Sequence, residues 1–459
     1  MKNIFKFTQS NSSIFFYILS GVVALVGINF HFGMTFYLSR LFIIVFLIGL
    51  LVRLSLKASI YINKVALVFG ALFFLILFQH FISVIISERV YDGLRQIFIY
   101  LGVMSLFIII LSMNFQTTTI IKGLKIFLAI GLFQGVYGIY QVIGGPFGWP
   151  TYQSIMSFIP TANDKTVDGF LYSGAFGLFR AYGFFPGDVS HYAAYMATIV
   201  TLTISFIMSD PRSKYLKIVL FISVLALLLS LSRSGLLALI LFGLPALFFL
   251  TVKLKVISNK SYLIFFLYLC GSIVALMIFG PKIGDLIGFD TSHLFETVNR
   301  RIYDLVNAGQ DPQGSMSIHI LTRLMALDAF TLNPFFGTGL GVNASPWFSE
   351  TYSAGWAGSH SHHFDILGQT GILGAFLEWF FMLLVAQYMW RGLKLKQALI
   401  HEKLILAGLF STFILIIFGN ILYHYFLNDF VWYLMGTGVA LSRAMIIDSN
   451  KKKQCLLGR

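Results

Sequence analysis

The chain of 459 residues is short of charged side chains and of cysteine. Only 11% of its residues are charged, whereas a water-soluble domain carries about 25%. The mean hydropathy of +0.84 leaves too few polar side chains to solvate a surface in water. Cys270 lies in an apolar run and Cys455 in a basic tail, which excludes a disulfide framework and a thiolate metal site. These shortages exclude a soluble domain and favour a membrane protein.

Motifs of soluble enzymes are also missing from the sequence. It contains no P-loop, no dinucleotide-binding glycine pattern, no serine-hydrolase elbow and no paired cysteine motif. We therefore expect no cofactor and no cytoplasmic energy source. The net charge of +14 is not gathered into one patch, so a nucleic-acid partner is not indicated.

Long apolar runs fill most of the chain and predict an all-α polytopic membrane protein. A spanning helix needs about 20 mostly apolar residues. Twelve segments meet this length or come close to it: 14–33, 36–54, 65–86, 93–113, 119–145, 189–208, 215–232, 234–252, 262–280, 366–390, 404–423 and 425–446. No small-residue cleavage site follows the first segment, so we interpret it as an uncleaved helix.

The lysines and arginines set the orientation of these twelve spans. With the N-terminus in the cytoplasm, 22 of the 32 basic residues fall on the cytoplasmic side. Only Asp210, Glu402 and Asp448 of the 18 acids share that side. This bias is typical of multi-pass proteins and predicts that both termini are cytoplasmic. We expect a lipid bilayer as the surroundings.

The spans divide the chain into six segments with two large outward loops. The segments are 1–145 with spans one to five, the loop 146–188, 189–280 with spans six to nine, the loop 281–365, 366–446 with spans ten to twelve, and the basic tail 447–459. Loops of this length are usually functional or disordered. Apolar periodicity in the second loop predicts short amphipathic helices over 291–308 and 317–332, the latter ending at Asn333-Pro334.

Ten basic residues remain on the outward side, against the general bias. Arg233 is the most conspicuous, because it lies in a very short turn with no acid nearby in sequence. Such a charge is a functional candidate by default, although it could also be an anchor at the membrane interface. The planar guanidinium of arginine suits a diphosphate, since it offers paired hydrogen bonds and stays charged.

Histidines gather just before the tenth predicted span, in residues 359–365. A neutral imidazole accepts a proton near neutral pH, so these residues are candidate general bases as well as candidate helix caps. His360 and His363 share a helix face but are three apart, whereas zinc pairs on a helix usually sit four apart. We therefore expect no metal site. Glu378 is the clearest ionisable residue deep inside a span.

Four sequence blocks on the predicted outward side form a pattern. The strongest is His360-Ser361, nine residues, then Gly371-Ile372-Leu373-Gly374. The other three precede it: Arg180 with Gly183, Phe184 and Pro186; Ser232-Arg233-Ser234-Gly235-Leu236-Leu237; and Arg323 through Asn333-Pro334 to Gly337-Thr338-Gly339-Leu340-Gly341. Together the blocks run from residue 180 to 380. In sequence and in order they resemble the bacterial O-antigen ligases and Wzy-type polysaccharide polymerases.

The resemblance implies a metal-independent, GT-C-like membrane glycosyltransferase. Such an enzyme moves glycan from an undecaprenyl-diphosphate carrier to an acceptor hydroxyl, in O-antigen, capsule or exopolysaccharide synthesis. By this resemblance His360 removes the proton of the acceptor, while Arg180, Arg233 and Arg323 hold the diphosphate. His363 is a further substrate-binding candidate. Gly371 and Gly374 let the tenth helix pack closely against its surroundings.

The acceptor stays open within this interpretation. It is a glycan on a second carrier lipid for a polymerase, with a chain-length regulator as a possible partner, lipid A-core for a lipopolysaccharide ligase, or a protein for a pilin oligosaccharyltransferase. We favour the polymerase, because long loops with many outward charges suit two bulky glycans. From other classes, a lipid-linked oligosaccharide flippase or a non-catalytic scaffold are alternatives. Transporters tend to show internal repeats and a polar site at mid-membrane, and the sequence shows no convincing repeat.

Overall fold

The computed structural model describes residues 9–25, 29–31, 35–37, 40, 43–44, 63–87, 90–144, 149, 172–173, 178–185, 189–258, 315–341, 343–344, 356–357 and 359–457. Over these residues the regular secondary structure is helical apart from three short pairs of antiparallel strands. The predicted helical membrane fold is thereby confirmed in its coarse form.

The helices follow the apolar runs, since in lipid a helix satisfies its own backbone hydrogen bonds. They are α1 (Gln9–Ala24), α3 (Lys64–Ile85), α4 (Val90–Ser112), α5 (Thr117–Gly144), α8 (Val189–Ser209), α9 (Lys214–Leu229), α10 (Arg233–Ala238), the π-helical turn η2 (Leu239–Gly243), α11 (Leu244–Lys253), α14 (Ser315–Leu332), α16 (His362–Leu393), α17 (Ile400–Leu422) and α18 (Asp429–Leu457). The strand pairs are β1 (Asn29–His31) with β2 (Thr35–Tyr37), β3 (Tyr172–Ser173) with β4 (Leu178–Phe179), and β5 (Asn343–Ala344) with β6 (Trp356–Ala357).

Eight of the described helices are long and apolar enough to cross a bilayer, counting α10, η2 and α11 as one. Each coincides with a predicted span. Helices α1 and α9 coincide with two more, but each has only 16 residues. The predicted spans 36–54 and 262–280 lie mostly or wholly outside the described residues, as do the predicted helix 291–308 and most of both large loops. The number twelve therefore stays a prediction.

The end of the first predicted span is wrong. We predicted a helix over 14–33, but α1 ends at Ala24 and Asn29–His31 pairs with Thr35–Tyr37 as an antiparallel hairpin. Phe36 and Tyr37, assigned to the start of the second span, belong to this hairpin. Its aromatic residues favour strands, and Gly33 lies between the two strands, so extended pairing replaces the helix here.

The predicted span 234–252 is a helix with an irregular turn. Leu239–Gly243 forms a π-helical turn between α10 and α11, and Pro245 lies in the first turn of α11. Proline has no N–H and its ring clashes with the carbonyl four residues before it, which accounts for the wider turn. Such turns occur often at functional sites.

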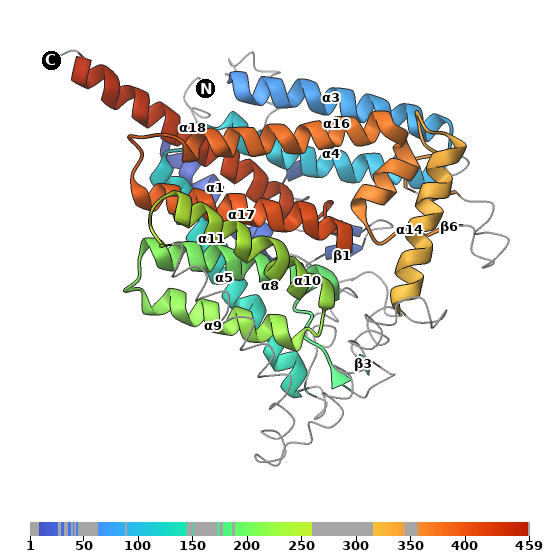
Figure 1. The fold of residues 1–459 in the computed structure, drawn as a ribbon, viewed down its shortest axis with the longest axis horizontal. Coiled ribbons are helices and arrows are strands. Elements are labelled where there is room, and N and C mark those ends of the chain that lie inside the picture. The colour runs from blue at the N-terminus through green and yellow to red at the C-terminus, as the bar shows by residue number, and fades with distance from the viewer. Residues whose placement is uncertain are drawn as a thin grey trace, which may run out of the picture.

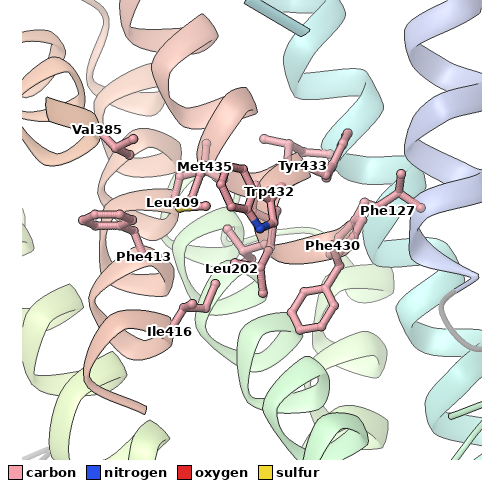
Figure 2. Close-up of a cluster of buried hydrophobic side chains, with 14 of the residues drawn as sticks. Phe127, Leu202, Val385, Leu409, Phe413, Ile416, Phe430, Trp432, Tyr433 and Met435 are labelled. Atoms are coloured by element: carbon pink, nitrogen blue, oxygen red, sulfur yellow. The ribbon is translucent and has the colours of Figure 1, made fainter. Parts of the chain in front are cut away.

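Helices α8, α17 and α18 form the interior of the bundle. Most residues in their apolar stretches are buried, whereas fewer than half are buried in the apolar stretches of α3, α4, α5 and α16. Figure 2 shows the core between them, with Trp432 of α18 among residues from α5, α8, α16 and α17. The Trp432 side chain is 1% exposed, and its indole N–H donates to the Phe426 carbonyl at 2.7 Å. The buried indole therefore keeps a partner for its polar atom.

Helix α14 lies at one end of the bundle, opposite the end from which α18 projects (Figure 1). It spans Ser315–Leu332 and stops at Asn333-Pro334, which confirms the helix predicted over 317–332. Helix α14 packs on α16, and its end leads into the glycine-rich segment 337–341. This end of the bundle carries most of the residues singled out from the sequence.

Candidate functional site

The turn before α16 and the end of α17 meet beside α14. Arg323 of α14 donates from Nη2 to the Ile421 carbonyl at the end of α17, at 2.9 Å. Thr322 Oγ1 donates to the Ser359 carbonyl (3.3 Å), and Ser361 Oγ donates to the Asn420 carbonyl (3.0 Å). These bonds tie the segment before α16 to both α14 and α17.

His360 has a left-handed backbone, with φ of +54°. This conformation is uncommon outside glycine and costs about 1–2 kcal/mol, so the surroundings must hold it. Ser359 supplies part of that hold: its hydroxyl donates to the Ser361 carbonyl (2.8 Å) and accepts from the Ser361 amide (3.2 Å). The Ser359 amide in turn donates to Asp365 Oδ1 at 2.6 Å. Hydrogen bonds between the residues on either side of His360 therefore hold its backbone in this conformation.

The His360 ring packs against two aromatic neighbours from other elements. The His319 ring of α14 meets it edge to face, with centroids 4.6 Å apart and an interplanar angle of 84°. Tyr423, in the turn between α17 and α18, lies with its centroid 5.6 Å away. Two imidazoles and a phenol thus share one small region.

His319 is held in its neutral form. Burial, with repulsion from the neighbouring His360, Arg323 and Arg233, lowers its pKa from the ordinary 6.5 to about 4. Both arginines are therefore close enough to His319 to disfavour a proton on it. Its Nδ1 atom is buried and has no hydrogen-bond partner among the described residues. A neutral imidazole at pH 7 can accept a proton.

Arg323 lies four residues after His319 on the same face of α14. Besides the Ile421 carbonyl, Nη2 contacts the Leu422 carbonyl at 3.5 Å, so the guanidinium covers the open end of α17. Its Nε atom is buried without a hydrogen-bond partner in the described part of the chain. Burial lowers the pKa of Arg323, but an arginine remains charged at any relevant pH.

Arg233 begins α10 directly after a strained turn. Leu231, two residues earlier, has a left-handed φ of +53°, which is rare for a large side chain. The hydroxyls of Ser232 and Ser234 on either side of Arg233 are 3.1 Å apart. The strained turn therefore places Arg233 at the end of the bundle that holds His319.

Arg180 is anchored on the same turn as Arg233. Its Nε atom donates to the Ser230 carbonyl at 2.9 Å, and the amide of Ala181 donates to the Leu229 carbonyl at 3.1 Å. Gln141 of α5 holds the next residues, because its Oε1 atom accepts from the Gly183 amide at 2.9 Å. The structure thus brings Arg180 to the turn that precedes Arg233.

His363 is engaged within the bundle. Its Nε2 atom donates to the Ile417 carbonyl of α17 at 2.9 Å, and its Nδ1 atom accepts from the Trp379 indole at 3.2 Å. Both ring nitrogens are therefore occupied in this arrangement. The structure gives His363 the contacts of a residue that packs α16 on α17.

Gly371 breaks α16. Its φ of +66° and ψ of −169° are not helical, and an added Cβ atom would come within 2.4 Å of the Phe335 carbonyl carbon. The segment after Pro334 enters this break, where the amide of Ile372 donates to the Pro334 carbonyl at 2.8 Å. Gly374 lies one turn further, where a Cβ atom would meet Gln79 Oε1 at 2.7 Å. Both glycines of the predicted pair therefore sit at close approaches.

Three residues of this region were missed by the sequence reasoning. His319 carried a usable signal, since it precedes Arg323 by four residues on a predicted helix. Tyr423 and His424 lie in the short turn between the last two spans, on the predicted outward side. His424 Nδ1 pairs with Asp365 Oδ2 at 2.9 Å. The other oxygen of Asp365 accepts from the Ser359 amide, so His424 helps to hold the backbone at His360. Only the folded chain brings this turn to His360.

The described cluster combines proton acceptors with fixed positive charges. Within the described residues, no three His, Cys, Asp or Glu side chains come together closely enough to hold a metal ion. Neutral imidazoles beside guanidiniums can take a proton from a hydroxyl group while an anion is bound.

The family comparison covers this region. Residues 218–377 match the family model described as O-antigen ligase. This segment is therefore similar to the O-antigen ligases. The resemblance inferred from the sequence is confirmed, and the matched segment contains Arg233, His319, Arg323, His360 and the Gly371–Gly374 pair. No curated protein matches the chain.

The match to the O-antigen ligase model indicates the broad role of the protein. Together with the apolar helices it supports an integral membrane enzyme of the ligase or polymerase type, a class whose substrates are a lipid-linked glycan and an acceptor. Arg180 and His424 lie outside the matched residues, so their place near this site rests on the structure alone.

Proposed function

We propose that the protein is a membrane glycosyltransferase that moves glycan from an undecaprenyl-diphosphate carrier to an acceptor hydroxyl. The observation that carries the proposal is the cluster of His360, His319, Arg233 and Arg323 at one end of the bundle. A base and two fixed positive charges are the groups that such a transfer needs. The proposal places this end on the outer side of a bacterial inner membrane, with both termini in the cytoplasm.

The reaction replaces one bond at the anomeric carbon with another. The acceptor oxygen bonds to the anomeric carbon of the donor sugar, and the bond from that carbon to the diphosphate oxygen breaks. His360 takes the hydroxyl proton, and undecaprenyl diphosphate leaves with the electron pair of the broken bond. The neutral His319 ring beside it lets His360 gain a positive charge without a second charged imidazole 4.6 Å away.

The arginines stabilise the leaving group. Negative charge grows on the diphosphate as the sugar bond breaks, and positive charges already in place stabilise it without reorganisation. Arg323, with its unpartnered Nε atom, and Arg233 belong to the same cluster as His360. Arg180 is held on the turn that carries Arg233. We assign these three residues to the diphosphate and His363 to helix packing.

A transfer assay with the purified protein tests this function. The protein in nanodiscs is incubated with an undecaprenyl-diphosphate-linked oligosaccharide and, separately, a second carrier-linked unit, lipid A-core or a pilin as acceptor. We expect release of undecaprenyl diphosphate and a heavier acceptor, with the second carrier-linked unit favoured. Translocation of the donor across a vesicle membrane with no transfer to any acceptor would instead identify a transporter.

A further inference from the structure

A cluster of buried polar side chains lies inside the bundle, between α3, α4 and α16. Gln79, His80, Tyr100, His362 and Glu378 are between 0% and 5% exposed. Ionisable groups in the interior of a membrane protein are costly unless they are paired, and they are candidate functional residues by default. The proposed transfer does not use Glu378 or His80.

Glu378 joins two histidines through its two carboxylate oxygens. Its Oε2 atom lies 2.7 Å from His362 Nε2, and its Oε1 atom lies 3.2 Å from His80 Nε2. Tyr100 interacts with the same carboxylate, and its ring meets the His80 ring edge to face at 4.6 Å. Several donors around one carboxylate favour its ionised form.

The amide of Gln79 determines which His80 nitrogen carries a proton. Gln79 Nε2 lies 2.6 Å from the Thr370 carbonyl oxygen, so this atom must be the donor. The other amide atom, Oε1, then faces His80 Nδ1 at 3.1 Å. An amide oxygen accepts only, so His80 Nδ1 must bear a hydrogen.

The second nitrogen of His80 must donate as well. It faces an ionised carboxylate oxygen, and two lone pairs 3.2 Å apart in a buried site would repel without a proton between them. We propose that His80 is a permanently protonated imidazolium, paired with the Glu378 carboxylate inside the membrane bundle. The pair is neutral overall, which is the form that a buried site favours.

This ion pair holds the break in α16 in place. Gln79, oriented by His80, bonds the Thr370 carbonyl, and Ser83 Oγ donates to the Gln369 carbonyl at 2.6 Å. Gln369 and Thr370 directly precede the break at Gly371. Helix α3 therefore satisfies carbonyls beside the break, and His80 and Glu378 are positioning residues for the segment that begins with His360.

Other titratable groups border the pair on the side of the functional site. His362 Nδ1 is buried with no hydrogen-bond partner among the described residues, and the His362 ring lies 5.0 Å from the His424 ring. His424 pairs with Asp365. His362 therefore needs only one hydrogen, on Nε2, whereas His80 needs two.

Nitrogen NMR of the ¹⁵N-histidine-labelled protein in nanodiscs tests the protonation state. An ordinary histidine, with a pKa near 6.5, is neutral at pH 9. We expect one histidine to keep hydrogens on both ring nitrogens at that pH, and its signal to be absent from His80→Gln. A wild-type His80 with an unprotonated Nε2 atom at pH 9 would overturn the proposal, and this result needs no variant that folds.

Two glutamate variants distinguish the effect of the Glu378–His80 ion pair from that of removing any carboxylate. Glu378→Gln removes the buried charge, and Glu402→Gln makes the same change at the exposed start of α17. We expect the doubly protonated signal at pH 9 to be absent from Glu378→Gln and to persist in Glu402→Gln. Persistence in both variants would contradict the pairing.

The role in positioning rests on the proposed function, whereas the protonation state does not. In the transfer assay Glu378→Gln should lower kcat by about 100-fold with little change in donor KM, the loss typical of misplaced catalytic groups. An unchanged kcat would refute the positioning role. If the wild-type protein shows no transfer at all, the proposed function fails while the NMR result stands.

Discussion

Two residues with left-handed backbones, Leu231 and His360, flank the candidate site. Neither is a glycine, and each adopts a conformation that costs about 1–2 kcal/mol. Strain of this kind persists only where surrounding contacts enforce it, and it gathers at functional sites. Here it turns Arg233 and the His360 ring to the same end of the bundle. The sequence patterns around both residues were visible, but their backbone strain was not.

The first prediction concerns the several N–H donors of the Arg323 guanidinium. Lysine keeps the charge but cannot cover the Ile421 carbonyl and reach the diphosphate together. We expect Arg323→Lys to raise the donor KM by about tenfold, the equivalent of one hydrogen bond of ~1.4 kcal/mol to a charged group. Steady-state kinetics with Arg212→Lys, in the exposed turn before α9, as the control measure this. Equal KM values for the two variants would remove Arg323 from the donor site.

His319 gives a prediction about pH. Its pKa is about 4 in the folded protein and near 6.5 in the unfolded chain. Both states are neutral above pH 6.5, so its contribution to stability is complete there. Between pH 6.5 and 4 the unfolded chain binds a proton on this histidine and the folded protein does not. The free energy of unfolding therefore falls as the pH is lowered through this range. Thermal unfolding of His319→Gln should therefore depend less steeply on pH in this window than that of the wild type. Parallel curves would speak against a buried neutral His319.

At the scale of elements, the broken helix α16 organises the site. Its sequence gives a plain apolar run, so a continuous helix over 366–390 was the natural prediction. The break at Gly371 arises because segment 333–341 inserts its backbone there and takes up hydrogen bonds. This insertion depends on contacts between distant parts of the chain, which a local pattern does not contain.

Gly371 gives the prediction for this element. In Gly371→Ala the left-handed φ alone costs about 1–2 kcal/mol, and the new Cβ atom would meet the backbone of Phe335 at 2.4 Å. We expect a marked fall in the thermal unfolding midpoint in detergent. Gly70→Ala is the matched control, since no heavy atom lies within 4 Å of its Cβ position. Equal unfolding midpoints for the two variants would mean that α16 does not break at Gly371.

At the scale of the whole molecule, composition and hydropathy predicted most of the helices. Charge counting then divided the lysines and arginines into 22 inward residues and ten outward ones. The hairpin β1–β2 was not predicted, because a window of apolar residues does not distinguish a helix from paired strands. Glu378 stood out as a buried charge, but its partner His80 lies 298 residues away in the sequence and could not be inferred.

The candidate site was likewise predicted from the sequence only in part. Arg233, Arg323 and His360 were predicted from motifs, and the structure brings them together around His319. His363 shares the motif but has both ring nitrogens occupied by the bundle. Motif spacing does not say which of two nearby histidines turns toward the site. The tertiary contacts of α14 and of the turn after α17 decide it.

The transfer assay on two histidine variants tests the central claim most directly. Undecaprenyl diphosphate release is measured for wild type, His360→Ala and His363→Ala in nanodiscs, with the thermal unfolding midpoint of each recorded. We predict that His360→Ala loses transfer while staying folded, and that His363→Ala keeps a substantial part of it. Near-normal transfer by His360→Ala, with loss in a folded His363→Ala, would contradict this account of the site.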